Sequence, residues 1–364
     1  MAQSDDARLM SLALALGRRG LGRTWPNPAV GAVIVKDGVI VGRGWTQPGG
    51  RPHAEVEALR RAGDAARGAT LYVTLEPCSH YGKSPPCADA VIAAGISRVV
   101  SARDDPNPEV AGAGHARLRA AGITVDVGLG AEEARRDHAG HIRRMRDGRP
   151  HVTLKLAVST DGKAGAAGRR PVAITGDAVR DRVHLMRAES DAIMVGIGTA
   201  LADDPMLTCR LPGMEKNSPV RIVLDSSLCL PLGSRLVRTA GEVPVWVVAG
   251  NEGPPHAEEA LQAHGVEVLR ALGNSGRFDL ATVLKDLAVR GLTRLMVEGG
   301  PTLASALVAA DLVDEAVLFV SARTIGSSGI DAFDGLAEAV LKRRLRRLGT
   351  EPVGVDRQEV YGRG

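Results

Sequence analysis

Three zinc-type ligands in two short motifs constrain this chain more than any other feature. The first motif is His53-Ala54-Glu55, and the second supplies Cys78, directly after Pro77, and then Cys87, with eight residues between the two cysteines. Imidazole and thiolate groups suit Zn²⁺, and a catalytic zinc takes three protein ligands and leaves its fourth position to water. The chain must therefore fold so that His53, Cys78 and Cys87 meet around one metal ion.

The glutamate of the first motif indicates what a zinc-bound water could do. Zinc lowers the pKa of its water toward neutrality, and the resulting hydroxide can attack a ring carbon that bears an amino group. A proton must then reach the departing ammonia, and Glu55 stands two residues after His53 to carry it. A His-x-Glu motif followed by Pro-Cys is the signature of zinc nucleobase deaminases, in which the glutamate is not a ligand. We therefore predict a zinc-dependent deaminase site with Glu55 as its catalytic residue.

Both motifs are expected in the first turn of a helix. Pro52 precedes His53 and Pro85-Pro86 precede Cys87, and proline favours the first helical position. A helix N-terminus also lowers the pKa of a thiol, which favours the zinc-binding thiolate. A structural zinc site would need a fourth ligand, for which His80 is the nearby candidate, and chance spacing is the other alternative. The occurrence of both motifs in the right order favours the open, catalytic site.

Length and cysteine content predict a two-domain protein from a reducing compartment. A chain of 364 residues suits two domains, each with its own core. Its four cysteines do not make a disulfide scaffold, and Cys209 and Cys229 are expected to be small core residues. No apolar run is long enough to span a membrane, and Asp5 and Asp6 stand where a signal peptide would be basic. We expect a soluble, cytoplasmic protein without a membrane partner.

The charge balance favours a small phosphorylated substrate over nucleic acid. The formal net charge is only +4, and the chain has three residues each of Trp, Tyr and Phe. Single-stranded nucleic acid is usually held by aromatic side chains interleaved with basic ones, so no nucleic-acid partner is expected. Arg343-Arg344 and Arg346-Arg347 are interpreted as the solvated face of a helix.

Apolar runs rich in Val and Ile alternate with Ala-rich helical stretches, which predicts an α/β fold with buried, largely parallel strands. A polar segment at Arg146–Pro150 divides the chain into expected domains 1–148 and 149–364. The expected strands are 29–35, 39–42, 70–74, 98–101, 124–127, 151–158, 192–195, 221–224, 245–249, 266–269, 294–298 and 315–320.

The second half carries weaker chemical signals. Glycines follow the expected strands in Val195–Thr199 and Val297–Leu303, where backbone amides could hold a phosphate or simply form tight turns. Neither segment is a G-x-G-x-x-G motif. Asp203-Asp204-Pro205 could cap a turn or act in chemistry. Lys155 lies inside an apolar strand, where a lysine is uncommon unless it is paired, at an edge or functional.

A series of motifs runs through both halves of the chain: Pro26-Asn27-Pro28, His53-Ala54-Glu55, Glu76–His80, Pro85-Pro86-Cys87, Arg103–Pro108, Lys155, Asp161-Gly162-Lys163, Leu201–Pro205, Leu207–Arg210 and Val297–Gly300. With these motifs in this order, the whole chain resembles the bifunctional riboflavin-biosynthesis deaminase-reductase family, RibD or RibG. The resemblance implies a cytidine-deaminase-like three-layer α/β/α domain followed by a dihydrofolate-reductase-like domain with a mostly parallel sheet. It further implies deamination of 2,5-diamino-6-(5-phosphoribosylamino)pyrimidin-4(3H)-one and then NADPH-dependent reduction of the ribosyl group to ribityl.

The family pattern also implies roles for individual residues. Besides one zinc ion per chain on the three ligands, it implies NADPH, a phosphorylated pyrimidine substrate and a homo-oligomer, either a dimer or a tetramer. Implied substrate contacts are Asn27, Lys83, Arg187, Leu207, Arg210 and Glu298. Implied NADPH contacts are Ala157, Thr199, Asp203, Ser226, Gly300, Pro301, Thr302, Leu303, Ala304, Ser305 and Ala306. Candidates for proton transfer in the reduction are Lys155, Asp203 and Glu298.

Two positions depart from the family pattern. Thr46 stands where members often have a histidine, which removes one substrate contact of the deaminase. Ala173 stands where many members have a tryptophan near the reductase cofactor. Two alternatives to the family function are a single-activity deaminase of nucleosides or tRNA with an accessory domain, and a non-catalytic zinc-stabilised binding module.

Overall fold

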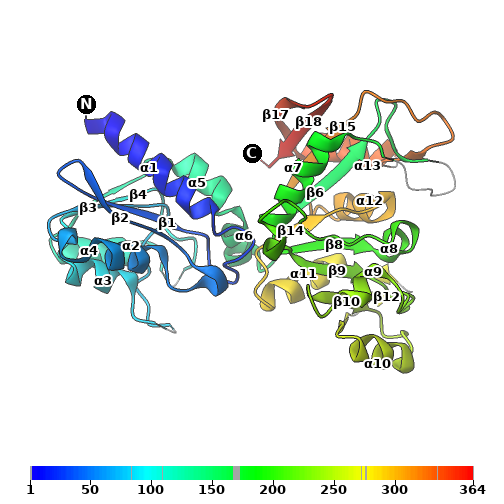
Figure 1. The fold of residues 1–364 in the computed structure, drawn as a ribbon, viewed down its shortest axis with the longest axis horizontal. Coiled ribbons are helices and arrows are strands. Elements are labelled where there is room, and N and C mark those ends of the chain that lie inside the picture. Colours follow the sequence, from blue (N-terminus) through cyan, green and yellow to red (C-terminus); the bar gives the residue numbers. More distant parts are fainter. Residues whose placement is uncertain are drawn as a thin grey trace. The chain divides into compact units, whose positions relative to one another are not determined.

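The computed structural model describes residues 2–82, 84–108, 110–166, 173–271, 273–274, 277–333 and 335–363. It divides into two compact units, unit 1 (Met1–Gly148) and unit 2 (Arg149–Gly364) (Figure 1). In the described part of the chain, no helix has both the length and the apolar character needed to cross a membrane.

Unit 1 is built on one mixed sheet in the order β2-β1-β3-β4-β5. Strand β1 runs antiparallel to β2 and β3, whereas β3, β4 and β5 are parallel. The strands are β1 (Gly31–Lys36), β2 (Val39–Trp45), β3 (Thr70–Val73), β4 (Arg98–Ser101) and β5 (Thr124–Val127). The helices are α1 (Ala2–Arg18), α2 (Ala54–Ala62), α3 (Cys87–Ala93), α4 (Ala113–Ala120), α5 (Ala131–Asp137) and α6 (Ala139–Asp147).

Alternating side chains of β1 give the unit 1 sheet two buried faces. Ala32 and Ile34 point to one face, where they join a core that includes residues of α2, α3 and α4. Val33 and Val35 point to the other face, where they join residues of α1 and α5. Helices therefore cover both faces, as the predicted three-layer α/β/α architecture requires (Figure 1).

Glycine in β2 lets helix α2 approach the sheet closely. A Cβ atom at Gly44 would lie 2.4 Å from the carbonyl oxygen of Ala54, closer than packed atoms tolerate. Because Ala54 is the first residue of α2, this contact fixes where His53 and Glu55 enter the site.

Unit 2 is built on a longer sheet in the order β11-β10-β9-β8-β14-β6-β15-β18-β17. Neighbouring strands are parallel from β11 to β15, and a C-terminal antiparallel hairpin completes the edge. The strands are β6 (His151–Val158), β7 (Lys163–Gly165), β8 (Ala192–Gly196), β9 (Val220–Leu224), β10 (Val245–Ala249), β11 (Glu267–Arg270), β12 (Gly273–Asn274), β13 (Arg277–Phe278), β14 (Arg294–Val297), β15 (Glu315–Val320), β16 (Ile330–Asp331), β17 (Arg346–Val353) and β18 (Asp356–Gly362). The helices are α7 (Asp177–Ala188), α8 (Ile197–Asp203), α9 (Arg235–Arg238), α10 (Pro255–Ala263), α11 (Leu280–Val289), α12 (Pro301–Ala309) and α13 (Gly335–Arg344).

The two faces of the unit 2 sheet are also both covered. Val195, Val223 and Val247 pack in a cluster that includes residues of α8, α9 and α10. On α7, Val179 and Val183 pack against a second cluster of sheet residues. The predicted two-domain α/β fold is thus confirmed, with the parallel strands buried between helices.

Two sequence-based expectations are wrong. Cys229 was expected in the core, but it is exposed, because it lies in the irregular segment after β9. Arg346 and Arg347 were assigned to a helix face, but α13 ends at Arg344 and these two arginines begin β17. Pairing with β18 imposes the extended conformation on this exposed segment.

Candidate active sites

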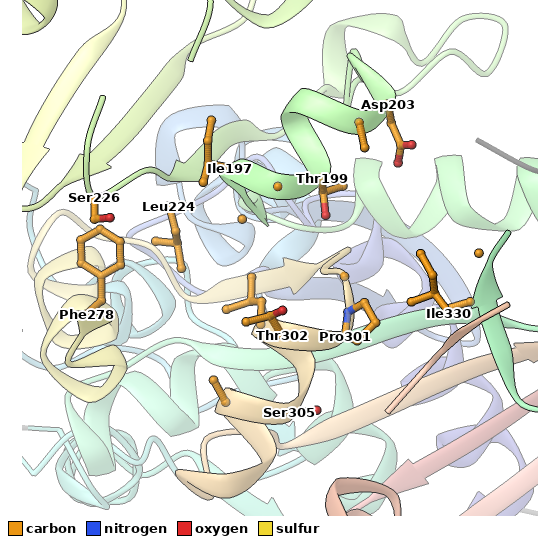
Figure 2. Close-up of a pocket in the computed structure, with 18 of the residues that line it drawn as sticks. Ile197, Thr199, Asp203, Leu224, Ser226, Phe278, Pro301, Thr302, Ser305 and Ile330 are labelled. Atoms are coloured by element: carbon orange, nitrogen blue, oxygen red, sulfur yellow. The ribbon is translucent and has the colours of Figure 1, made fainter. Parts of the chain in front are cut away.

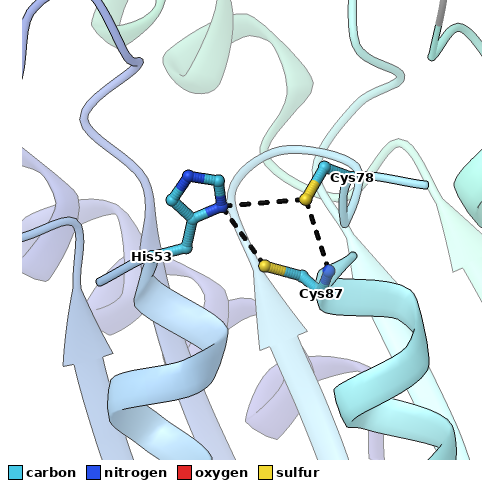
Figure 3. Close-up of side chains that lie close together, drawn as sticks. All are labelled: His53, Cys78 and Cys87. Carbon is cyan, nitrogen blue, oxygen red and sulfur yellow. Dashed lines mark hydrogen bonds between the residues drawn. The ribbon is translucent and has the colours of Figure 1, made fainter. Parts of the chain in front are cut away.

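The three predicted zinc ligands come together in unit 1 (Figure 3). Nδ1 of His53 lies 3.3 Å from Sγ of Cys87 and 3.7 Å from Sγ of Cys78. Two ligands of one tetrahedral zinc, at about 2.1 Å for nitrogen and 2.3 Å for sulfur, would be about 3.6 Å apart. These donor atoms therefore have the spacing of a zinc site.

Local structure explains how the ligands meet. His53 is the N-cap of α2 and Cys87 is the first residue of α3, as the prolines before them predict. Cys78 lies in the segment that follows β3, and its Sγ accepts a hydrogen bond of 3.3 Å from the backbone N–H of Cys87. The end of a strand and the starts of two helices thus converge on one point.

The two thiols differ in acidity. Hydrogen bonding from Cys87 and from His53, against the effect of burial, lowers the pKa of Cys78 to about 4. The neighbouring Cys78 and then burial raise the pKa of Cys87. A divalent cation between the sulfurs would supply the charge that removes the second proton, so the donor set suits zinc.

Glu55 has the environment of a proton carrier. Its side chain is buried in the first turn of α2, and burial raises its pKa to about 7. A carboxyl group with a pKa near the working pH can both take and give a proton. Its interactions with Cys87 and with the charge of His53 place it beside the ligands.

Other residues expected at this site have different surroundings. The Asn27 side-chain amide donates to the carbonyl of Gly50 (2.8 Å) and lies 3.5 Å from Nε2 of His53. Thr46 is buried and its hydroxyl accepts from a backbone N–H, so it serves the fold. His80 is exposed and does not belong to the ligand cluster, which holds no fourth His, Cys, Asp or Glu among the described residues. Lys83 lies outside the described residues.

Unit 1 contains a second group of side chains of the kinds that bind metal ions, but their hydrogen bonds indicate a structural role. Glu76, Asp104 and His115 bring their polar atoms within 4.8 Å of one another. However, the Glu76 carboxylate already accepts hydrogen bonds from four backbone N–H groups of residues 105–115. Glu76 therefore organises the segment behind the zinc ligands.

Unit 2 contains a cavity of about 990 Å³ at the carboxyl ends of its parallel strands (Figure 2). The glycine-containing segment after β8 and the one after β14, which starts α12, both line it. The N-cap of α12 is Gly300, which has no side chain to cap the first amides. Free amides at a helix N-terminus favour a phosphate group, so the cavity suits the diphosphate of a dinucleotide.

Most residues expected at the cofactor line this cavity. They are Thr199, Asp203, Ser226, Gly300, Pro301, Thr302, Leu303, Ser305 and Ala306. Two do not: Ala304 is fully buried in the core, and Ala157 lies half-buried in β6. Burial raises the pKa of Asp203, the last residue of α8. Asp204, and not Asp203, adopts the left-handed conformation at the end of that helix.

Glu298 is the centre of a buried charged cluster. Arg187 donates to both of its carboxylate oxygens, at 2.7 and 3.0 Å, and Nζ of Lys155 lies 3.6 Å from Oε2. Burial opposes ionisation of Glu298, but the charges of Arg187 and Lys155 outweigh it and lower its pKa to about 2. The strand lysine is therefore paired, and Glu298 is an anion at neutral pH.

The segment Leu207–Arg210 joins this cluster through Thr208. The Thr208 carbonyl accepts from Arg187 (3.1 Å), and the guanidinium of Arg210 donates to the Thr208 hydroxyl (3.4 Å). Leu207 has a positive φ of 56° and its side chain packs in the core, so only its backbone is free to face a substrate. The cluster thus presents Lys155 and two arginines close together, which suits a phosphorylated substrate.

Sequence reasoning missed two residues that line the unit 2 cavity and one buried arginine in the sheet beneath it. Arg277 and Phe278 line the unit 2 cavity, although nothing in the sequence around them is a motif. Arg221 is fully buried in β9, where it donates to three backbone carbonyls and to the Thr239 hydroxyl. The signal for Arg221 was present, since it interrupts an apolar strand as Lys155 does.

Comparison with known proteins connects both sites to characterised families. Residues 3–103 match the model of the cytidine and deoxycytidylate deaminase zinc-binding region, and residues 150–357 match the RibD C-terminal domain. Riboflavin biosynthesis protein RibD of Escherichia coli is 44% identical, with 97% of this chain and 98% of that protein covered. The protein of the same name from Aquifex aeolicus is 42% identical, with 98% of both chains covered.

Solved structures show the same architecture over the whole chain. RibD of Acinetobacter baumannii superposes with a TM-score of 0.87 at 37% identity, covering 99% of each chain. A protein from Thermotoga maritima superposes with a TM-score of 0.86 at 35% identity, covering 100% of each chain. That protein is described as a diaminohydroxyphosphoribosylaminopyrimidine deaminase/5-amino-6-(5-phosphoribosylamino)uracil reductase.

Proposed function

The chain belongs to the RibD family of bifunctional riboflavin-biosynthesis enzymes, which join a deaminase to a reductase, and we propose that each of its two units carries one of these activities. Unit 1, which contains the zinc-binding region, would deaminate, and unit 2 would reduce. The two matched regions imply zinc for the first reaction and NADPH for the second.

The substrates we propose are those named for the Thermotoga maritima protein. Unit 1 would convert 2,5-diamino-6-(5-phosphoribosylamino)pyrimidin-4(3H)-one into the corresponding uracil. Unit 2 would then reduce the ribosyl group of that product to ribityl, giving 5-amino-6-(5-phosphoribitylamino)uracil. The cationic cluster of Lys155, Arg187 and Arg210 supports a phosphorylated substrate for the second step.

In unit 1, His53, Cys78 and Cys87 would hold zinc, and Glu55 would move the proton. Bound zinc would supply an acidified water and stabilise negative charge on oxygen during attack on the amino-bearing ring carbon. The Glu55 carboxylate would take a proton from the attacking water and pass it to the ring nitrogen. It would then take the proton of the newly added hydroxyl group and pass it to the amine, which leaves as ammonia while the carbonyl forms. Its pKa of about 7 supports both directions of transfer. Asn27, beside His53, would orient the pyrimidine.

In unit 2, Lys155 is our choice for the proton donor. NADPH would supply a hydride to C1′ of the ring-opened imine, and the imine nitrogen must then gain a proton. Glu298 has a pKa of about 2 and both its oxygens are engaged by Arg187, so it has no proton to give at neutral pH. Glu298 would instead hold the Lys155 ammonium group in position.

The convergence of His53, Cys78 and Cys87 within 4.8 Å is the observation that carries the proposal. The test supplies the full chain with the diaminopyrimidinone phosphate and NADPH and follows ammonia and NADPH together. We expect one ammonia released for each NADPH consumed, and continued ammonia release when NADPH is omitted. Ammonia released only from nucleosides or tRNA, without NADPH loss, would support a single-activity deaminase and contradict the proposal.

Metal content tests the ligand assignment. We propose one zinc ion per chain, so metal analysis of the purified protein should give a ratio of one. Cys87→Ser should lose the metal, whereas Cys229→Ser, at an exposed position away from the cluster, should retain it. Equal zinc content in both variants would contradict the assignment. We also propose a homo-oligomer, which native mass spectrometry would detect as a dimer or tetramer.

A further inference from the structure

The unit 2 cavity extends across the carboxyl ends of four neighbouring strands. In the sheet these strands follow one another as β9, β8, β14 and β6. Lining residues follow each of them in turn: Ser226 after β9, Gly196 at the end of β8, Gly300 after β14 and Ala164 after β6. Three strand spacings correspond to roughly 14 Å, so the cavity can hold an extended ligand along this edge.

The charged cluster identifies the reacting end of the cavity. Lys155 belongs to β6, and its partner Glu298 directly follows β14. The nicotinamide ring, which donates the hydride, must lie near Lys155 and Glu298. We therefore assign it to the end of the cavity next to β6. The amides at the start of α12 then suit the diphosphate, and the β9 side remains for the adenosine.

The β9 end of the cavity has its own set of side chains. Figure 2 shows Phe278, Ser226 and Leu224 at one end of the cavity, while Asp203 and Ile330 lie at the opposite end. Arg277 precedes Phe278 in the short strand β13 and also lines the cavity.

Arg277 is the one Lys or Arg among the described residues that line the cavity, and Asp203 at the far end is the one carboxylate. Arg277 is exposed, and no carboxylate lies within ion-pair distance of it in the described part of the chain. Because the N-terminal amides of α12 are assigned to the diphosphate, the Arg277 guanidinium is available to bind a further phosphate group of the ligand.

Among the described residues, the carboxylates next to the lining residues at the β9 end are held by protein groups. Asp279, between Phe278 and Leu280, does not line the cavity, and its carboxylate accepts from the backbone N–H of Ala281 (3.1 Å) and the hydroxyl of Thr282 (2.6 Å). NAD-selective sites use an Asp or Glu for the adenosine 2′-OH, whereas NADP-selective sites place an Arg near the 2′-phosphate. Asp225 follows β9, but it is 1% exposed and its Oδ2 accepts from the backbone N–H of Leu230 at 2.7 Å. The charges at this end therefore favour a phosphate over a hydroxyl group.

We propose that Arg277, Phe278 and Ser226 form the subsite for the adenosine 2′-phosphate and make the reductase selective for NADPH over NADH. Arg277 binds the phosphate as a bidentate donor, Phe278 stacks on the adenine, and the Ser226 hydroxyl donates to the same end of the ligand. The proposal rests on the reductase function of unit 2.

The test measures equilibrium binding of NADP⁺ and NAD⁺ to the full chain by calorimetry. Arg277→Ala should weaken NADP⁺ binding by about 10- to 100-fold and change NAD⁺ binding by less than about 2-fold, because only NADP⁺ carries the 2′-phosphate. Arg277→Lys should retain part of the NADP⁺ affinity. The matched control is Arg290→Ala, since Arg290 pairs with Glu267 and does not line the cavity.

A second pair of ligands isolates the adenosine end. Adenosine 2′,5′-bisphosphate should bind more tightly than 5′-AMP to the unaltered chain, and Arg277→Ala should remove that difference. Phe278→Ala should weaken both ligands by a similar factor. Equal losses for NADP⁺ and NAD⁺ in Arg277→Ala, or no loss for either, would overturn the proposal while leaving the reductase function intact. If the unaltered chain binds neither dinucleotide, the reductase function itself fails.

Discussion

The Glu76 carboxylate is expected to hold together the segment behind the zinc ligands. Its Oε2 accepts from the backbone N–H groups of Asp105 (3.0 Å) and Gly112 (2.9 Å). Its Oε1 accepts from those of Gly114 (2.8 Å) and His115 (3.2 Å). The side chain is fully buried, so water cannot replace it as an acceptor.

The substitution Glu76→Gln should therefore be costly. It turns one oxygen into an NH₂ group that faces two N–H donors, and two hydrogen bonds to a charged acceptor are lost. At about 1.5 to 3 kcal/mol each, the local loss is about 3 to 6 kcal/mol. This is a large fraction of the roughly 5 to 15 kcal/mol that stabilises a domain. The control is Glu132→Gln, because Glu132 is 76% exposed and its pair with Arg135 contributes at most about 1 kcal/mol.

Native-state hydrogen exchange of the full chain measures this effect locally. Peptides that cover residues 105–116 should lose protection by a factor of about 10² to 10⁴, which corresponds to 3 to 6 kcal/mol. Peptides of unit 2 should exchange as before, and zinc content should fall. A protection loss below about fivefold in Glu76→Gln, or an equal loss in Glu132→Gln, would refute the role of this carboxylate.

Three further predictions concern single positions. Gly114→Ala should lower zinc content, measured by metal analysis, because its Cβ would lie 2.0 Å from the carbonyl oxygen of Pro77, next to a ligand. Glu298, with its pKa lowered to about 2, should contribute its full stability above its unfolded pKa of about 4.5 and lose that contribution progressively as pH falls from about 4.5 through about 2. In a steady-state profile of reductase rate against pH, ionisation of Glu298 should consequently cause no change between about pH 5 and pH 9. A titration in that range that is seen in the unaltered chain and is absent from Glu298→Gln would contradict this prediction. Arg221→Met should destabilise unit 2 by about 2 to 4 kcal/mol in chemical denaturation, because it leaves buried carbonyl groups without donors; an unchanged midpoint would contradict it.

Patterns that act locally predicted much of the fold. The expected ranges 98–101, 124–127, 151–158, 245–249 and 315–320 coincide with β4, β5, β6, β10 and β15. Four of these segments are largely apolar runs with buried or half-buried side chains, so burial and local propensity favour the same conformation. The exception is β5, which is mostly exposed and pairs with β4.

Features that depend on distant pairing were not predictable in this way. Strand β17 is exposed along nearly its whole length and has no apolar alternation, and its extended form comes from pairing with β18. Likewise, β13 brings Arg277 and Phe278 to the cavity although neither belongs to a recognisable motif. Tertiary context therefore decided both cases.

In the candidate sites, too, local sequence patterns were predictive and contacts between distant segments were not. The spacing of His53, Cys78 and Cys87 predicted a cluster that the structure brings together, because zinc chemistry restricts the ligand types so strongly. Lys155 could be recognised as unusual, but its partner Glu298 lies 143 residues away in the chain and only the sheet makes them neighbours. Pairing across parallel strands therefore had to come from the structure.

The central claim is that one chain performs two reactions at separate sites, and the most direct test is a pair of substitutions in α2. Glu55→Gln should abolish ammonia release from the diamino substrate while NADPH oxidation with the deaminated substrate continues at the original rate. Glu57→Gln, which changes the other buried glutamate of the same helix, should retain both activities. Undiminished ammonia release by Glu55→Gln, or loss of NADPH oxidation with the deaminated substrate, would contradict the account.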